Sequence, residues 1–128
     1  MIVATAIAAT AAGLLHVFIF TLESILWDSD FARGVFSIAD PEESRATRSM
    51  AFNQGFYNLF LAVMAIVGAI LALTGGNSAG MALIIAGTGS MTAAALVLLL
   101  SDPTKRSAAF KQMALPLLTL VLLAISLV

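Results

Sequence analysis

Four long apolar stretches dominate the sequence and constrain its fold more than any other feature. They run over residues 2–27, 52–73, 79–100 and 108–128. A helix needs about 20 mostly apolar residues to cross the hydrocarbon core of a bilayer, and each stretch is long enough. Because helices satisfy their own backbone hydrogen bonds in lipid, the sequence predicts four transmembrane helices.

The composition excludes an ordinary soluble domain. The 128 residues are 61% hydrophobic and 10% charged, whereas soluble domains carry about 25% charged residues. We therefore expect one all-α integral membrane domain over residues 1–128, a four-helix bundle whose main partner is the lipid bilayer. The net charge of -1 gives no indication of nucleic-acid binding. No cofactor motif is present, and His16 with Glu23 supplies too few ligands to predict a metal site.

The basic residues predict the orientation in the membrane. All six lie in the first connection or in and just after the third, namely Arg33, Arg45, Arg48, Lys105, Arg106 and Lys111. Because Lys and Arg are enriched on the cytoplasmic side, these connections are expected in the cytoplasm. Both termini and the Gly75–Ser78 turn are then expected outside.

The first connection carries a helix start. Asp40 is expected to cap a helix that begins at Pro41, with Glu43 completing a capping box. This predicts a short cytoplasmic helix or extension leading into the second span. Before it, four apolar side chains are expected to lie flat in the headgroup layer: Phe31, Val35, Phe36 and Ile38.

Polar residues inside the first span share one face with small ones. At about 100° per residue, an arc of roughly 60° holds Thr5, Ala9, Ala12, His16 and Glu23. Small residues mark helix contacts in membranes, so His16 and Glu23 are expected to face the bundle interior. Ionisable residues at membrane depth are candidates for function.

On the second span, polar residues again share a face with small ones, and this face is expected to meet the first span. The fourth span adds a polar residue at a similar depth. The candidate ligand-binding or proton-handling residues are therefore His16, Glu23, Asn53, Gln54, Tyr57, Asn58 and Gln112. Together they predict a polar pocket in the cytoplasmic half. Structural alternatives remain open: Glu23 could pair with Lys111 or an arginine of the first connection, His16 could bond a neighbouring helix, and the amides could simply join helices.

Several of these residues belong to motifs of a known family. They are Leu15-His16, Leu22-Glu23, Trp27, Arg33-Gly34-Val35-Phe36, Asn53-Gln54-Gly55-Phe56-Tyr57-Asn58 and Phe60-Leu61-Ala62. The chain resembles the uncharacterised bacterial membrane family called domain of unknown function 1304. The resemblance implies four helices and a place in the bacterial cytoplasmic (inner) membrane. It implies no activity.

Three functions are compatible with this pattern. The first is binding or transport of a small lipophilic or cationic molecule at Glu23. The second is an intramembrane enzyme acting on a lipid-like substrate, with His16 and Glu23 as acid and base. The third is an accessory or structural subunit, or a homo-oligomer, whose polar face docks another membrane protein. A pocket at Glu23 favours the first two, whereas a sealed bundle with Glu23 bonded to Lys111 favours the third.

Overall fold

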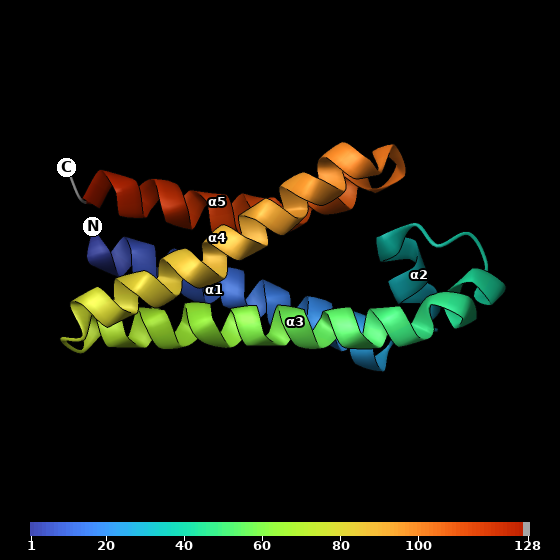
Figure 1. The fold of residues 1–128 in the computed structure, drawn as a ribbon, viewed down its shortest axis with the longest axis horizontal. Helices are drawn as coiled ribbons and strands as arrows, with labels where there is room; N and C mark the ends of the chain where they lie inside the picture. The colour runs from blue at the N-terminus through green and yellow to red at the C-terminus, as the bar shows by residue number, and fades with distance from the viewer. Residues whose placement is uncertain (127–128) are drawn as a thin grey trace.

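The computed structural model describes residues 1–126, and over these the chain is built from helices without strands. The elements are α1 (Ile2–Phe20), the π-helical turn η1 (Thr21–Ile25), α2 (Asp30–Phe36), α3 (Pro41–Leu73), α4 (Asn77–Ser101), the 3₁₀ turn η2 (Pro103–Lys105) and α5 (Arg106–Ser126). Among the described residues, 4 helices are long and apolar enough to cross a membrane. The expected all-α four-helix membrane bundle is confirmed (Figure 1).

The helix bounds differ from the apolar stretches in instructive ways. The second span is the membrane part of a longer helix, because α3 begins at Pro41 rather than near residue 52. Asp40 caps it and accepts from the backbone N–H groups of Glu42 and Glu43 at 2.9 and 2.8 Å. The Glu43 carboxylate accepts from the N–H of Ala39 at 2.8 Å, one residue earlier than a capping box requires. The last two residues of the fourth predicted span lie outside the described residues.

Small residues bring α1, α3 and α4 into close contact in one half of the bundle. A Cβ added to Gly80 in α4 would lie 2.5 Å from the backbone nitrogen of Ala72 and 2.8 Å from the carbonyl oxygen of Gly68. A Cβ on Gly13 in α1 would lie 3.2 Å from the carbonyl oxygen of Ala62. Backbones approach this closely in membranes where side chains are small. We call this part, from the turn at Gly75 and Gly76 up to Gly87, the closed half.

The two central helices separate beyond the closed half. Gly87 is the last close glycine contact along α4, and a Cβ there would lie 3.1 Å from the carbonyl oxygen of Leu61. From that point α4 runs away from α3 (Figure 1). The two helices therefore leave space between them toward the other end of the molecule, which we call the open half.

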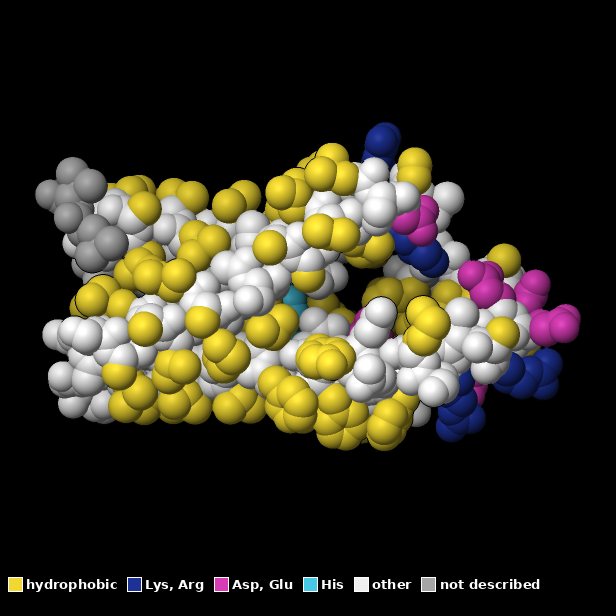
Figure 2. Space-filling view, viewed as in Figure 1, with side chains coloured by type: hydrophobic (Ala, Val, Ile, Leu, Met, Phe, Trp, Pro, Cys, Tyr) yellow, Lys and Arg dark blue, Asp and Glu magenta, His cyan; other side chains and the backbone are white. Residues whose placement is uncertain are grey.

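The charged side chains gather at the end of the open half, as Figure 2 shows. Apart from Glu23, every charged residue lies in the first or third connection or in the adjoining helix turns: Asp28, Asp30, Arg33, Asp40, Glu42, Glu43, Arg45, Arg48, Asp102, Lys105, Arg106 and Lys111. The turn at Gly75 and Gly76 stands at the opposite end and carries no charge. We call these the charged end and the uncharged end.

The short helix α2 corrects one expectation about the first connection. Phe31 and Val35 are exposed, as residues lying in a headgroup layer would be. Ile38, by contrast, is buried, and the ring of Phe36 packs against Trp27 with centroids 5.3 Å apart. The expected flat arrangement of all four side chains is therefore wrong, because the end of α2 and the residues after it turn Phe36 and Ile38 toward the charged end of the bundle.

Candidate functional site

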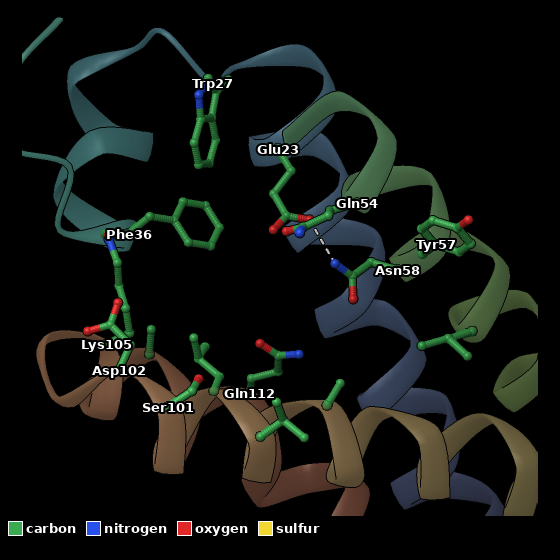
Figure 3. A pocket seen from close by; sticks show the side chains of 15 residues that line it. Glu23, Trp27, Phe36, Gln54, Tyr57, Asn58, Ser101, Asp102, Lys105 and Gln112 are labelled. Carbon is green, nitrogen blue, oxygen red and sulfur yellow. Dashed lines mark hydrogen bonds between the residues drawn. The ribbon is translucent and has the colours of Figure 1, made fainter. Parts of the chain in front are cut away.

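A cavity of about 450 Å³ lies between α3 and α4 in the open half. Figure 2 shows it as a hollow in the face where these helices separate, and Figure 3 shows its walls. Every element of the charged end contributes to the lining, which consists of Glu23, Trp27, Phe36, Gln54, Tyr57, Asn58, Leu61, Ala94, Val97, Leu98, Ser101, Asp102, Lys105, Ala108 and Gln112. The cavity thus combines apolar walls with a few polar groups, as small-molecule sites do.

Glu23 is the buried ionisable group of this cavity. It is 9% exposed, and its Oε2 accepts a hydrogen bond from Nδ2 of Asn58 at 2.7 Å. This bond joins the first and second spans, which were expected to contact each other. Over residues 1–126 the ion pairs join Arg33 to Asp30 and Arg48 to Asp28, so none of them involves Glu23. Lys111 is exposed and does not line the cavity, so the fixed ion pair with Glu23 is not formed.

The local backbone places Glu23 against α3. Glu23 lies in η1, whose π-helical hydrogen bond runs from the N–H of Leu26 to the carbonyl oxygen of Thr21 at 2.9 Å. Single π-helical turns inside helices are frequent at functional sites. On α3, a Cβ at Gly55 would lie 2.0 Å from Oγ of Ser24, so it would displace the hydroxyl that donates to the carbonyl oxygen of Phe52. The glycine of the Asn-Gln-Gly-Phe-Tyr-Asn run therefore serves close packing beside Glu23.

Two aromatic rings form one wall of the cavity. The rings of Trp27 and Phe36 lie at 43° to each other across from Glu23 and Gln54 (Figure 3). Trp27 is held in place because its Nε1 donates to the carbonyl oxygen of Ser44 at 2.9 Å. The sequence did not predict that Trp27 forms part of a wall. The available signal was its spacing from Glu23, which is about one helical turn.

Lys105 and Asp102 stand where the cavity meets the charged end. The ammonium of Lys105 donates to the carbonyl oxygens of Phe36 and Ser37, which ties the connection between α4 and α5 to the last residues of α2. The hydroxyl and the backbone N–H of Thr104 both donate to Asp102, and these bonds hold the pKa of Asp102 below its ordinary value. The ionised Asp102 therefore stands beside the Lys105 ammonium.

The structure brings some of the seven predicted site residues together and leaves two apart. The cavity is lined by Glu23, Gln54, Tyr57, Asn58 and Gln112. Asn53 is exposed and lies outside the lining, because it points about 100° around α3 from Gln54. In Figure 3 the ring of Tyr57 stands at the edge of the cavity and points away from Glu23.

His16 lies deeper in the bundle and does not line the cavity. It precedes Glu23 by seven residues, which is roughly 10 Å along a helix. Its side chain is fully buried and its Nδ1 lies 2.9 Å from the carbonyl oxygen of Ala12 in the same helix, whereas its Nε2 has no partner within residues 1–126. The bond to a neighbouring helix is therefore not seen. The expected acid–base pair of His16 and Glu23 is not assembled on one cavity.

Over residues 1–126, fold and cavity describe a small multi-pass membrane protein with four apolar spans and a buried carboxyl group inside the bundle. The chain belongs to the family described as protein of unknown function DUF1304, whose model matches residues 10–124. The resemblance expected from the sequence motifs is thereby confirmed. No curated protein and no solved structure shows a significant match to the chain.

Proposed function

We propose that the protein binds a small lipophilic cation in the cavity beside Glu23. One observation carries this proposal: a buried carboxylate lines a cavity of about 450 Å³, and its only side-chain hydrogen bond within residues 1–126 comes from a neutral amide. An ionised carboxylate away from water is costly unless a cation accompanies it. A cationic ligand in the cavity would supply that charge.

The remaining walls fit the same class of ligand. Trp27 and Phe36 offer ring faces to a cation, and aromatic walls of this kind recognise quaternary ammonium groups. The charged residues of the lining are Glu23, Asp102 and Lys105, so their formal charges leave one negative charge in excess. Neutral amides complete the polar part of the wall and can hold hydroxyl or carbonyl groups of the ligand: Gln54, Asn58 and Gln112.

The position of the cavity supports entry from the bilayer. Its hollow lies between α3 and α4, and it is flanked there by Tyr57 and Val97, which are 63% and 65% exposed. Both side chains belong to helices that face lipid. A lipophilic cation dissolved in the membrane therefore reaches Glu23 sideways, and its release at the charged end would complete transport.

The proposed setting is the bacterial cytoplasmic membrane, with the charged end in the cytoplasm. All six Lys and Arg residues lie at this end, and the positive-inside rule places such connections in the cytoplasm. The chain has no cysteine, so single cysteines can be introduced at the exposed Asn77 and Ser107. Labelling from outside is expected at Asn77→Cys only. Labelling of Ser107→Cys from outside would reverse the orientation.

The binding proposal is tested with a matched pair of probes. Benzyltrimethylammonium and neopentylbenzene have nearly the same shape, but only the first is charged. Trp27 is the single tryptophan, so its fluorescence reports occupancy of the cavity directly. We expect the cation to change this fluorescence with saturation and the neutral probe to bind at least about tenfold more weakly.

Two variants of the detergent-solubilised protein complete the test. Glu23→Gln should weaken binding of the cation by about tenfold or more, since it removes about 1.4 kcal/mol or more of binding energy. Glu42→Gln is the matched control, because Glu42 is exposed at the start of α3 and lies outside the cavity. Equal affinity for both probes, or equal affinity in Glu23→Gln and Glu42→Gln, would disprove the proposal.

A further inference from the structure

A second cavity also contains Glu23. It encloses about 250 Å³ and is lined by Glu23, Ser24, Ile25, Leu26, Trp27, Asp28, Ser29, Arg48 and Phe52. Glu23 and Trp27 line both cavities, whereas the other residues of the second cavity are absent from the first. Glu23 therefore contributes to the walls of two separate spaces, and its carboxyl group is bonded to Asn58 on the side of the first.

The second cavity belongs to the charged end. Its polar lining includes the ion pair between Arg48 and Asp28, whose Nη1 and Oδ2 atoms are 2.9 Å apart. These side chains are 69% and 39% exposed, so the pair stands in contact with water. Asp28 also accepts from the hydroxyl of Ser44 at 2.8 Å. This side of Glu23 is thus polar and wet, whereas the first cavity is bounded largely by apolar and aromatic side chains.

We propose that Glu23 exchanges a proton for the cationic ligand, and that the proton passes to water through the second cavity. This inference rests on the proposed function and adds that binding of the cation is coupled to release of a proton. In the empty protein a proton removes the charge of the buried carboxyl group. When the cation enters, the O–H bond of Glu23 breaks, the proton is transferred to water, and the electron pair stays on the carboxylate.

The hydrogen bond from Asn58 can form both to the protonated carboxyl group of Glu23 and to its carboxylate. Its amide N–H can donate to the carbonyl oxygen of a carboxylic acid as well as to a carboxylate. The total charge around Glu23 is the same with a proton or with a monovalent cation. The geometry of the site can therefore persist while the two positive charges replace each other.

The other carboxyl groups near Glu23 have charged neighbours, and the histidine lies outside the cavities. The second cavity contributes Asp28 and Arg48, which neutralise each other, and the first contributes Asp102 beside Lys105, together with Tyr57. His16 lies deeper in α1 and outside both cavities. Among the described residues, Asp28 is ion-paired with Arg48 and Asp102 lies beside Lys105, whereas the side chain of Glu23 is bonded only by the neutral amide of Asn58. Glu23 is therefore the group expected to release the proton.

Proton release is measured directly in a weakly buffered solution of the full-length protein with a pH indicator. Addition of benzyltrimethylammonium should release up to one proton per bound cation in the wild type and in Glu42→Gln. Glu23→Gln, saturated at a higher concentration, should release none. The affinity of the wild type should rise with pH, by at most about tenfold per pH unit, because protons compete with the cation.

Access through the second cavity is measured by chemical labelling. A water-soluble carbodiimide reacts with protonated carboxyl groups, and peptide mapping by mass spectrometry locates the product. We expect labelling of Glu23 from the aqueous phase, and protection when benzyltrimethylammonium is bound. Glu42, which lies outside both cavities, provides the internal control because its labelling should not depend on the cation.

The outcomes separate the two proposals. Saturable binding without proton release, and with an affinity independent of pH, would overturn the exchange while leaving the binding site intact. Proton release without labelling of Glu23 by the water-soluble reagent would overturn the route through the second cavity. If benzyltrimethylammonium does not bind, both the proposed function and the proton exchange are disproved.

Discussion

The two halves of the bundle are built from the same helices but meet opposite requirements. In the closed half, α3 and α4 touch backbone to backbone, because Gly68 and Gly80 leave no room for a side chain. In the open half, the same helices separate and enclose polar groups around Glu23. The closed half therefore fixes the angle between the helices, and this angle produces the cavity at the other end.

The contrast shows how a membrane protein of this size can contain a cavity. Association of helices in lipid depends on close packing rather than on a hydrophobic driving force. Close packing along the entire length would leave no space for a ligand. Confining the glycine contacts to one half leaves the other half free to carry larger and polar side chains, with Gly87 at the point of transition.

The largest loss of stability is expected from a substitution in the closed half. Gly80→Ala places a Cβ where backbone atoms of Ala72 and Gly68 already stand, at 2.5 and 2.8 Å. Backbone cannot move aside as a side chain can, so we expect a loss of about 1–3 kcal/mol in the free energy of unfolding. Thermal unfolding in detergent measures it.

A second glycine on the same helix provides the control. A Cβ on Gly89 would meet nothing within 4 Å. Gly89→Ala should therefore leave the stability unchanged or raise it slightly, since alanine favours helix formation. Equal destabilisation by the two alanine substitutions would show that the close contact at Gly80 is not what holds the closed half together.

The next effect compares two asparagines of α3. Asn58→Ala removes the bond to Glu23 and leaves a buried carboxyl group without its partner, so we expect a loss of about 1–2 kcal/mol in stability. Asn53→Ala should have almost no effect, because Asn53 is exposed and lines neither cavity. Chemical denaturation of both variants measures the difference. A larger loss in Asn53→Ala would place the polar contact of α3 elsewhere.

A smaller effect concerns the link across the charged end. Lys105→Ala removes the ammonium that binds the carbonyl oxygens of Phe36 and Ser37, so we expect α2 to loosen at a cost of about 1 kcal/mol. Quenching of Trp27 fluorescence by acrylamide should increase, since Phe36 covers the ring. Lys111→Ala removes an exposed lysine outside the cavity and should leave quenching as it is. Unchanged quenching in Lys105→Ala would contradict the link.

The smallest expected effect on stability belongs to the residue of greatest functional interest. Glu23→Gln preserves the shape of the side chain and a carbonyl oxygen that can accept from Asn58. No cation is left unpaired among the described residues, so stability should change by less than about 1 kcal/mol. Thermal unfolding without ligand measures this. A loss of a few kcal/mol would instead indicate a buried ion pair involving Glu23.

The sequence predicts the fold well because membrane insertion depends on local properties. Apolar length alone locates the four spans, and the cap at Asp40 follows from residues next to one another. The meeting of Glu23 with Asn58 was also expected, since polar and small residues share a face on each helix. These features depend on helical periodicity, which a single chain displays directly.

The shape of the site could not be predicted in the same way. The wall formed by Trp27 and Phe36 depends on how α2 turns back after the first span, and no periodic pattern encodes that turn. The separation of His16 from the cavity depends on where α4 leaves α3. The contact between Lys105 and the end of α2 joins residues far apart in the chain. Each of these features arises from tertiary geometry.

The π-helical turn η1 has a consequence for insertions and deletions. A π-helical turn holds one residue more than the α-helical turn it replaces. Deleting one residue within Thr21–Ile25 would convert the π-helical turn into an α-helical one, so the span would still cross the bilayer and Trp27 would keep its direction, while the turn that holds Glu23 against α3 would become one residue shorter. Two chains that differ by one residue here would therefore share the bundle and differ in the local geometry around Glu23.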